Sequence, residues 1–227
     1  MKRSYIIGIL ISYIFITNSF SQSSNTGNWF YYLGNQALNK KWNIHTEVQY
    51  RNYNFAGDLE QLLLRGGVGY NLSENNNNLL FGYAFVKTDK YINETDKSSV
   101  NENRLWQQFI TRQSFSRFYI QHRYRLEERW VGENDMTLRF RYLLALNVPI
   151  NKKTMSKYSF YLSLYNELFM NTKANGFDRD RIYGGIGYCL SKTLRFEFGY
   201  MSQRLESNHR NQTVITFFNN FKLYKEE

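Results

Sequence analysis

The chain has 227 residues, enough for one domain or at most two, and its formal net charge is +10. After residue 20 there is no run of about 18 apolar residues, so no membrane-spanning helix is expected in the mature chain. Aromatic residues make up 18% of the sequence, although the mean hydropathy is only -0.58. This combination is typical of a β-barrel in a membrane, because only alternate residues of each strand face lipid.

The first segment has the parts of a secretory signal peptide. Lys2 and Arg3 form a basic start, and residues 5–16 (YIIGILISYIFI) form an apolar stretch that small residues follow. We predict that residues 1–21 are the cleaved signal and that residues 22–227 form a single domain. An uncleaved anchor is disfavoured because the apolar stretch is short for a membrane span.

From Trp29 onward the sequence consists of extended runs rich in Val, Ile, Thr and aromatic residues, separated by polar clusters. No sustained helical period and no helix-capping box interrupts them. The predicted strands are residues 29–38, 42–53, 61–72, 78–88, 102–113, 117–130, 136–149, 157–170, 178–190, 194–205 and 212–224. The fold class is therefore all-β, and we expect an antiparallel transmembrane β-barrel.

The run at 117–130 alternates most clearly. One face carries Phe118, Ile120, His122, Tyr124, Leu126, Glu128 and Trp130, and the other carries Arg117, Tyr119, Gln121, Arg123, Arg125, Glu127 and Arg129. A soluble sandwich buries its apolar face, whereas a barrel in lipid turns that face outward. Strand length, the export signal and aromatic residues at strand ends favour the membrane barrel. These aromatic residues are Trp42, Tyr83, Trp106, Trp130, Tyr158, Tyr200 and Tyr224.

The connections alternate in length. Short ones are expected at 39–41, 73–77, 114–116, 151–156 and 191–193, and longer or more polar ones at 54–60, 89–101, 131–135, 171–177 and 206–211. Barrels place short turns in the periplasm, so the C-terminus is expected on that side. Bacterial single-chain barrels usually have an even number of strands. The count therefore stays open at 10 to 12, with ten if 29–38 is not a full strand and twelve if one strand is missed.

Several clusters follow one another in a recurring pattern. They are Glu102-x-Arg104-x-Trp106-Gln107-Gln108, His122-Arg123-Tyr124-Arg125-Leu126-Glu127-x-Arg129, Arg139-Phe140-Arg141-Tyr142, Asn166-Glu167, Phe177-Asp178-Arg179-x-Arg181 and Gly185-x-Gly187-Tyr188. In this order, over residues 29–224, they resemble the DUF2490 family of uncharacterised exported proteins of Gram-negative bacteria. The resemblance implies an outer-membrane β-barrel without an assigned activity, cofactor or catalytic residue.

Charged residues on the inferred inner face form the strongest candidate site. They are Glu47, Arg51, Arg65, Glu102, Arg104, Arg112, Arg123, Arg125, Glu127, Arg129, Arg139, Arg141, Glu167, Arg179, Arg181, Arg195 and Glu197. A narrow barrel fills its interior with side chains, and arginine bonds carboxylates bidentately. The set is then either a packed ionic core that joins strands or an electropositive lumen for a small anionic solute. Arginines outnumber glutamates by twelve to five in this set, so water or an anion must offset the excess.

An enzyme is not expected. The only candidates for a general base are His45, His122 and His209, and no serine lies in a G-x-S-x-G motif. His122 falls on the apolar face, His209 lies in a loop, and His45 is in line with Glu47 on the inner face. A membrane-embedded hydrolase acting on lipid or peptide and a soluble periplasmic protein that binds an anionic ligand are the alternatives.

The remaining features suggest partners but no cofactor. Scattered histidines and the single Cys189 offer no metal-ligand spacing and no internal disulfide. The export signal disfavours nucleic acid despite the basic charge, so outer-membrane lipid, lipopolysaccharide and a small anionic solute are the expected partners. The strand glycines, which precede no helix, are expected to allow close packing rather than to bind phosphate. They are Gly66, Gly67, Gly69, Gly82, Gly184, Gly185, Gly187 and Gly199.

Overall fold

The computed structural model describes residues 26–73, 76–172 and 176–224, and all of its regular elements are strands. The predicted signal peptide at residues 1–21 lies outside the described residues. Within the described ranges, no helix has the length and apolar character needed to cross a membrane.

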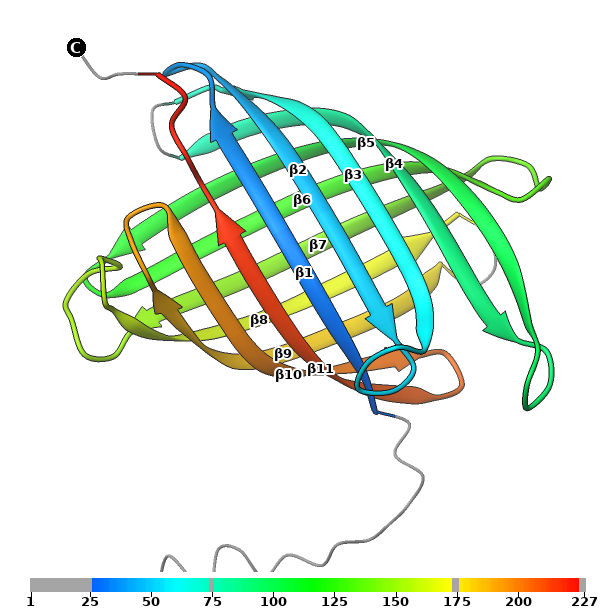
Figure 1. Cartoon of the computed structure of the whole chain (residues 1–227). Coiled ribbons are helices and arrows are strands. Elements are labelled where there is room, and N and C mark those ends of the chain that lie inside the picture. The colour runs from blue at the N-terminus through cyan, green and yellow to red at the C-terminus, as the bar shows by residue number, and fades with distance from the viewer. Residues whose placement is uncertain (1–25, 74–75, 173–175, 225–227) are drawn as a thin grey trace, which may run out of the picture.

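Eleven strands form one closed barrel (Figure 1). Their bounds are β1 (Thr26–Ala37), β2 (Trp42–Asn52), β3 (Leu59–Asn71), β4 (Asn77–Tyr91), β5 (Lys97–Phe115), β6 (Phe118–Val131), β7 (Thr137–Pro149), β8 (Phe160–Asn171), β9 (Phe177–Cys189), β10 (Leu194–Leu205) and β11 (His209–Asn219). The all-β barrel predicted from the alternation is confirmed, and most predicted strands match to within a few residues.

The barrel closes through a parallel pair. Consecutive strands are antiparallel, but β1 and β11 pair in parallel from Thr26↔Asn211 to Gly34↔Asn219. Figure 1 shows these two strands side by side, with their arrowheads pointing the same way. An up-and-down wall with an odd number of strands brings its first and last strands together in the same direction. Eleven lies within the predicted range of 10 to 12, and neither even alternative applies, because the run at 29–38 is a full strand and the described residues contain no twelfth.

The two chain ends leave the barrel at opposite rims. We call the rim with Thr26 and the connections after β2, β4, β6, β8 and β10 the N-terminal rim. The other, the C-terminal rim, carries the connections after β1, β3, β5, β7 and β9, together with residues 220–224. At this rim Phe221 and Leu223 form backbone hydrogen bonds with Ala37, so the segment after β11 stays attached to the barrel wall.

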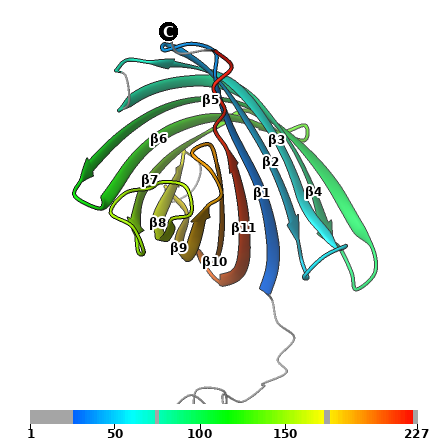
Figure 2. The ribbon, with the colours of Figure 1, turned by 60° about the vertical axis from the view of Figure 1, so that its left-hand side comes forward.

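The predicted difference between short and long connections is wrong. The connection at 150–159 belongs to the rim expected to have short turns, yet it is long, and most of the predicted loop at 89–101 is strand. There β4 and β5 pair with each other as far as Tyr91↔Lys97, beyond their pairing with β3 and β6. Figures 1 and 2 show this hairpin projecting at the N-terminal rim. Backbone hydrogen bonds between two strands do not require apolar side chains, so a polar segment can also form strand. For this reason the polar sequence of residues 89–101 did not indicate that β4 and β5 extend into it.

The outer face is apolar and the inner face is polar, as the alternation predicts. Exposed apolar side chains on most of the strands include Val48, Leu64, Phe81, Tyr124, Phe140, Leu164, Ile186, Phe198 and Phe217. Leu144 and Phe196 also point outward, each with 41% of its surface exposed. Buried arginines and glutamates alternate with these apolar residues along the strands and face the interior of the barrel.

Trp106 corrects one expectation. It is not an aromatic residue at the outer surface but is 0% exposed, inside the barrel with Leu80, Ala84 and Ile110. Trp106 lies two residues after Arg104 on β5 and therefore on the same face of the strand, so the alternation already places its side chain inside the barrel. Of the other predicted strand-end aromatics, Trp42, Tyr83, Tyr158 and Tyr200 are exposed, whereas Trp130 and Tyr224 are half-buried.

Glycines make room for this ring. A Cβ atom on Gly67 would lie 2.7 Å from Cζ2 of Trp106 and 2.8 Å from the carbonyl oxygen of Phe81. A Cβ atom on Gly66 would meet nothing within 4 Å. Close packing therefore explains Gly67, as the sequence predicts, whereas the same prediction is wrong for Gly66.

We expect Gly67→Leu to destabilise the barrel by about 1–3 kcal/mol, because the new side chain overpacks the lumen against Trp106. The matched variant Gly66→Leu adds the same atoms on the outside and should leave stability nearly unchanged. Thermal unfolding of the purified protein, followed by circular dichroism, measures both. Equal transition temperatures for the two variants would contradict the packing.

Candidate functional site: an arginine-rich lumen

Every charged residue predicted for the inner face is buried or half-buried in the structure. The buried ones are Glu47, Arg51, Arg65, Glu102, Arg104, Arg125, Glu127, Arg139, Arg141, Glu167, Arg181 and Glu197. The half-buried ones are Arg112, Arg123, Arg129, Arg179 and Arg195. Most of them belong to one connected set of ion pairs, which we call the lumen network.

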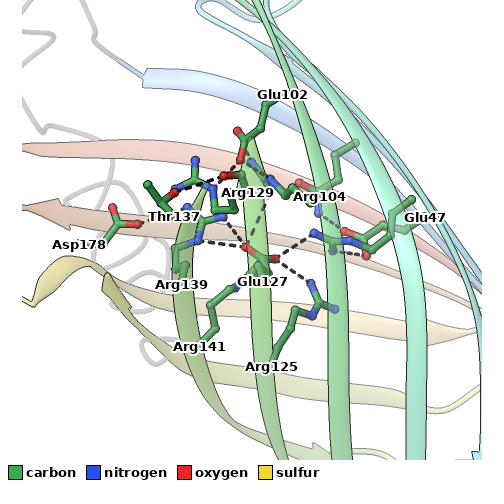
Figure 3. Close-up of polar contacts among 12 residues, drawn as sticks. Glu47, Glu102, Arg104, Arg125, Glu127, Arg129, Thr137, Arg139, Arg141 and Asp178 are labelled. Carbon is green, nitrogen blue, oxygen red and sulfur yellow. Dashed lines mark hydrogen bonds and ion pairs between the residues drawn. The ribbon is translucent and has the colours of Figure 1, made fainter. Parts of the chain in front are cut away.

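Glu127 on β6 is the centre of the lumen network. Its side chain is 0% exposed, and the guanidinium groups of Arg139 and Arg141 from β7 bond to its two oxygens (Figure 3). Three more arginines lie within ion-pair distance, namely Arg65 at 3.3 Å, Arg125 at 3.7 Å and Arg104 at 4.0 Å. One carboxylate therefore offsets the positive charges of arginines that come from four strands.

Glu102 on β5 forms a second node beside it. Arg104 donates from Nε and Nη2 to the two oxygens of Glu102, at 2.7 and 2.8 Å, which is the bidentate geometry that arginine favours. Arg129 of β6 donates to the same carboxylate. These contacts join β5 to β6 near the N-terminal rim.

Two arginines link Glu127 to glutamates on other strands. Arg65 bonds Glu47 at 2.7 Å as well as Glu127, and Arg141 bonds Glu167 at 2.6 Å as well as Glu127. Three of these contacts join neighbouring strands, whereas the contact of Arg65 on β3 with Glu127 on β6 joins strands that share no backbone hydrogen bonds. The lumen network therefore ties distant parts of the barrel wall together.

Asp178 is a member that alternation does not predict. It lies 3.2 Å from Arg139 and 2.9 Å from Arg179, although Arg179 follows it directly in the chain. The register of β8 and β9 shifts here, because Phe169 pairs with Arg179 while Met170 pairs with Phe177. Asp178 is the extra residue of this β-bulge, which turns its carboxylate inward beside its neighbour.

Aromatic rings lie between the arginines of the lumen. The Arg51 guanidinium lies 4.1 Å from the centre of the Trp29 ring, and those of Arg141 and Arg181 lie 4.4 and 4.7 Å from the Phe169 ring. Such cation–π contacts stabilise a guanidinium that has left water. Sequence reasoning missed Trp29 and Phe169 as lumen residues, although Phe169 shares the parity of Glu167.

A cavity of about 680 Å³ occupies the part of the lumen toward the C-terminal rim. Its lining includes Arg125, Arg141 and Glu167 of the lumen network, but Glu102 and Glu127 are not among the described lining residues. The lumen network is therefore the floor of the cavity. On the opposite side the lining reaches rim residues, which include Asn76, Ser114, Met155 and Asn220.

Positive charge exceeds negative charge along this lining. Six arginines line the cavity, namely Arg112, Arg123, Arg125, Arg141, Arg181 and Arg195, and three carboxylates do so, namely Glu47, Glu167 and Glu197. Arg123, Arg141 and Arg181 share the single carboxylate of Glu167. The cavity is consequently electropositive.

The histidines do not assemble into a catalytic or metal site. His45 lines the cavity, where its Nε2 lies 3.3 Å from Glu47 and its ring meets Trp106 edge to face. His122 lies 2.9 Å from the Tyr142 hydroxyl, and His209 begins β11 opposite Arg204 rather than lying in a loop, which corrects that expectation. The described residues hold no group of three His, Cys, Asp or Glu side chains placed to bind a metal.

We expect Glu127→Gln to destabilise the barrel by about 3–5 kcal/mol, because five arginines lose the carboxylate that offsets them. The matched variant Glu128→Gln changes the next residue, on the other face, where the carboxylate has no ion pair among the described residues and accepts a hydrogen bond from Gln107. It should change stability by less than about 0.5 kcal/mol. Urea unfolding of the purified protein gives both values, and a Glu127→Gln midpoint equal to that of Glu128→Gln would refute the role of Glu127.

The comparisons with known proteins place this barrel in a family. The family described as "Protein of unknown function (DUF2490)" matches residues 26–214. Comparison with curated proteins and with solved structures gave no match. The matched range includes most of the chain and all the lumen charges described above, so the protein belongs to the DUF2490 family.

Proposed function

We propose that this protein is an outer-membrane β-barrel that binds a small anionic solute in its lumen cavity. The observation that carries the proposal is the electropositive cavity above a floor of paired charges, inside a wall with an apolar exterior. In this arrangement the lumen network has a structural role, and the cavity has the binding role.

The outer face supports the membrane setting. Large apolar side chains are exposed on strand after strand, and in water they would form an apolar surface far larger than soluble monomers usually expose. The strands have 11 to 19 residues, which suffices for the 9–11 tilted residues of a membrane-spanning strand. A soluble periplasmic protein, the alternative, has no physical reason to expose this surface.

The cavity supports an anionic ligand. Its volume of about 680 Å³ falls within the range of small-molecule sites. Guanidinium groups remain charged at all physiological pH values, and a low-dielectric wall strengthens their field within a cleft. Since the described carboxylates of the lining do not balance the arginines, an anion that enters offsets the remaining charge.

The floor supports binding rather than passage. Arg141 bonds Glu127 at 2.7 Å and Glu167 at 2.6 Å, and Arg65 bonds Glu47 at 2.7 Å. A solute crossing the barrel would have to separate these buried ion pairs, and breaking such a pair is costly.

We propose a binding protein rather than an enzyme. His45 is the histidine that lines the cavity, but its ring nitrogen faces the Glu47 carboxylate at 3.3 Å. The hydroxyl of Ser163, which also lines the cavity, donates to Glu197 instead. A serine paired with a base, as a hydrolase needs, is not formed by these groups.

The membrane setting predicts that the expressed protein is recovered with the outer membrane and requires detergent for extraction. Its electrophoretic migration should also change on heating, because a folded barrel resists unheated dodecyl sulfate. Cell fractionation and paired heated and unheated gels are the measurements. Recovery in the soluble periplasmic fraction without detergent would contradict the proposal.

The closed floor predicts that the purified protein in a planar bilayer gives no steady open-channel conductance in the presence of salt. In this proposal the ion pairs of Glu127 close the path between the cavity and the N-terminal rim. The control is a bacterial porin in the same bilayer. Stepwise conductance with a preference for anions would replace the binding proposal with a pore.

A further inference from the structure

Of the six arginines that line the cavity, Arg112 and Arg195 are the two that have no described carboxylate within ion-pair distance. Arg112 on β5 donates from Nε to the amide oxygen of Gln121 at 3.1 Å. Arg195 on β10 lies over the Phe218 ring at 4.1 Å, and its buried Nε has no hydrogen-bond partner. Both side chains line the lumen cavity.

These two positive charges face each other across the cavity. In the closed strand order, β5 and β10 lie on opposite sides of the barrel wall. Both side chains bring a positive charge into the same cavity, where like charges repel each other. Glu197, the nearest carboxylate along β10, is engaged by the hydroxyls of Tyr161 at 2.8 Å and Ser163 at 3.1 Å rather than by Arg195. A bound anion between the arginines would remove the repulsion.

The walls near these arginines indicate what kind of anion fits. Ile110 and Leu143 line the cavity on one side, and Leu33 and Val214 line it on the other. Phe218 adds an aromatic ring against Arg195. Apolar walls beside a pair of guanidinium groups suit a ligand that has an apolar body and one carboxylate. The carboxylate is planar, and a guanidinium group can donate two parallel hydrogen bonds to its two oxygens.

We propose that Arg112 and Arg195 clamp the carboxylate of a small organic acid whose apolar body lies against these walls. This assignment rests on the proposed binding function and names its ligand class and its anchoring residues. Removing either arginine breaks no described ion pair, so we expect the substitution to affect ligand binding more than stability.

Titration calorimetry of the full-length mature protein in detergent tests the clamp, with benzoate as the probe and benzamide as its neutral counterpart. We expect the unmodified protein to bind benzoate and not benzamide. Arg112→Gln and Arg195→Gln should each weaken benzoate binding by at least about tenfold, because each removes a charge-assisted bond to the carboxylate. The matched control is Arg117→Gln, an exposed arginine at the same rim, which should bind like the unmodified protein.

Thermal unfolding without ligand is the second measurement. Arg112→Gln and Arg195→Gln should melt at or above the temperature of the unmodified protein, which shows that weaker binding does not come from misfolding. Unchanged benzoate affinity in both variants would overturn the clamp while leaving an anion-binding cavity in place. Binding of inorganic phosphate in preference to benzoate would overturn the organic-acid assignment. Binding of neither anion by the unmodified protein would overturn the proposed function itself.

Discussion

The structure depends on the burial of one carboxylate among five arginines. Glu127 is 0% exposed, and unpaired charges of this kind are too costly to hold in a barrel interior. Its contacts with arginines from β3, β5, β6 and β7 favour closure of the wall with these strands in their observed register. Backbone hydrogen bonds join neighbouring strands, and the lumen network adds contacts between strands that are not neighbours.

This constraint divides the lumen into two parts. Toward the N-terminal rim, paired charges and the rings of Trp29, Trp106 and Phe169 fill the interior. Toward the C-terminal rim, the wall leaves a cavity in which arginines exceed carboxylates. The two interpretations of the inner charges, an ionic core and an electropositive site, thus apply to different halves of the same barrel. The inward-facing side chains, which are every second residue of each strand, form both parts of the lumen.

Alternation predicted the barrel and the inward face of its charges, because a period of two assigns each side chain to one side of a strand. It did not predict Asp178, because a β-bulge breaks the period there. It did not predict the parallel pairing of β1 with β11, since closure depends on the whole wall rather than on any one strand. Which arginines remain unpaired also depends on distances across the lumen. Arg112 and Arg141 look alike in sequence, but only Arg141 reaches carboxylates.

A double-mutant cycle between Glu127 and Arg139 tests the central interaction most directly. Unfolding free energies are measured for Glu127→Gln, for Arg139→Met and for the combination of the two. If Glu127 offsets an excess of arginine, removing Arg139 relieves part of that excess, so the double variant should be more stable than Glu127→Gln alone. A double variant whose loss of stability equals the sum of the two single losses would contradict the account.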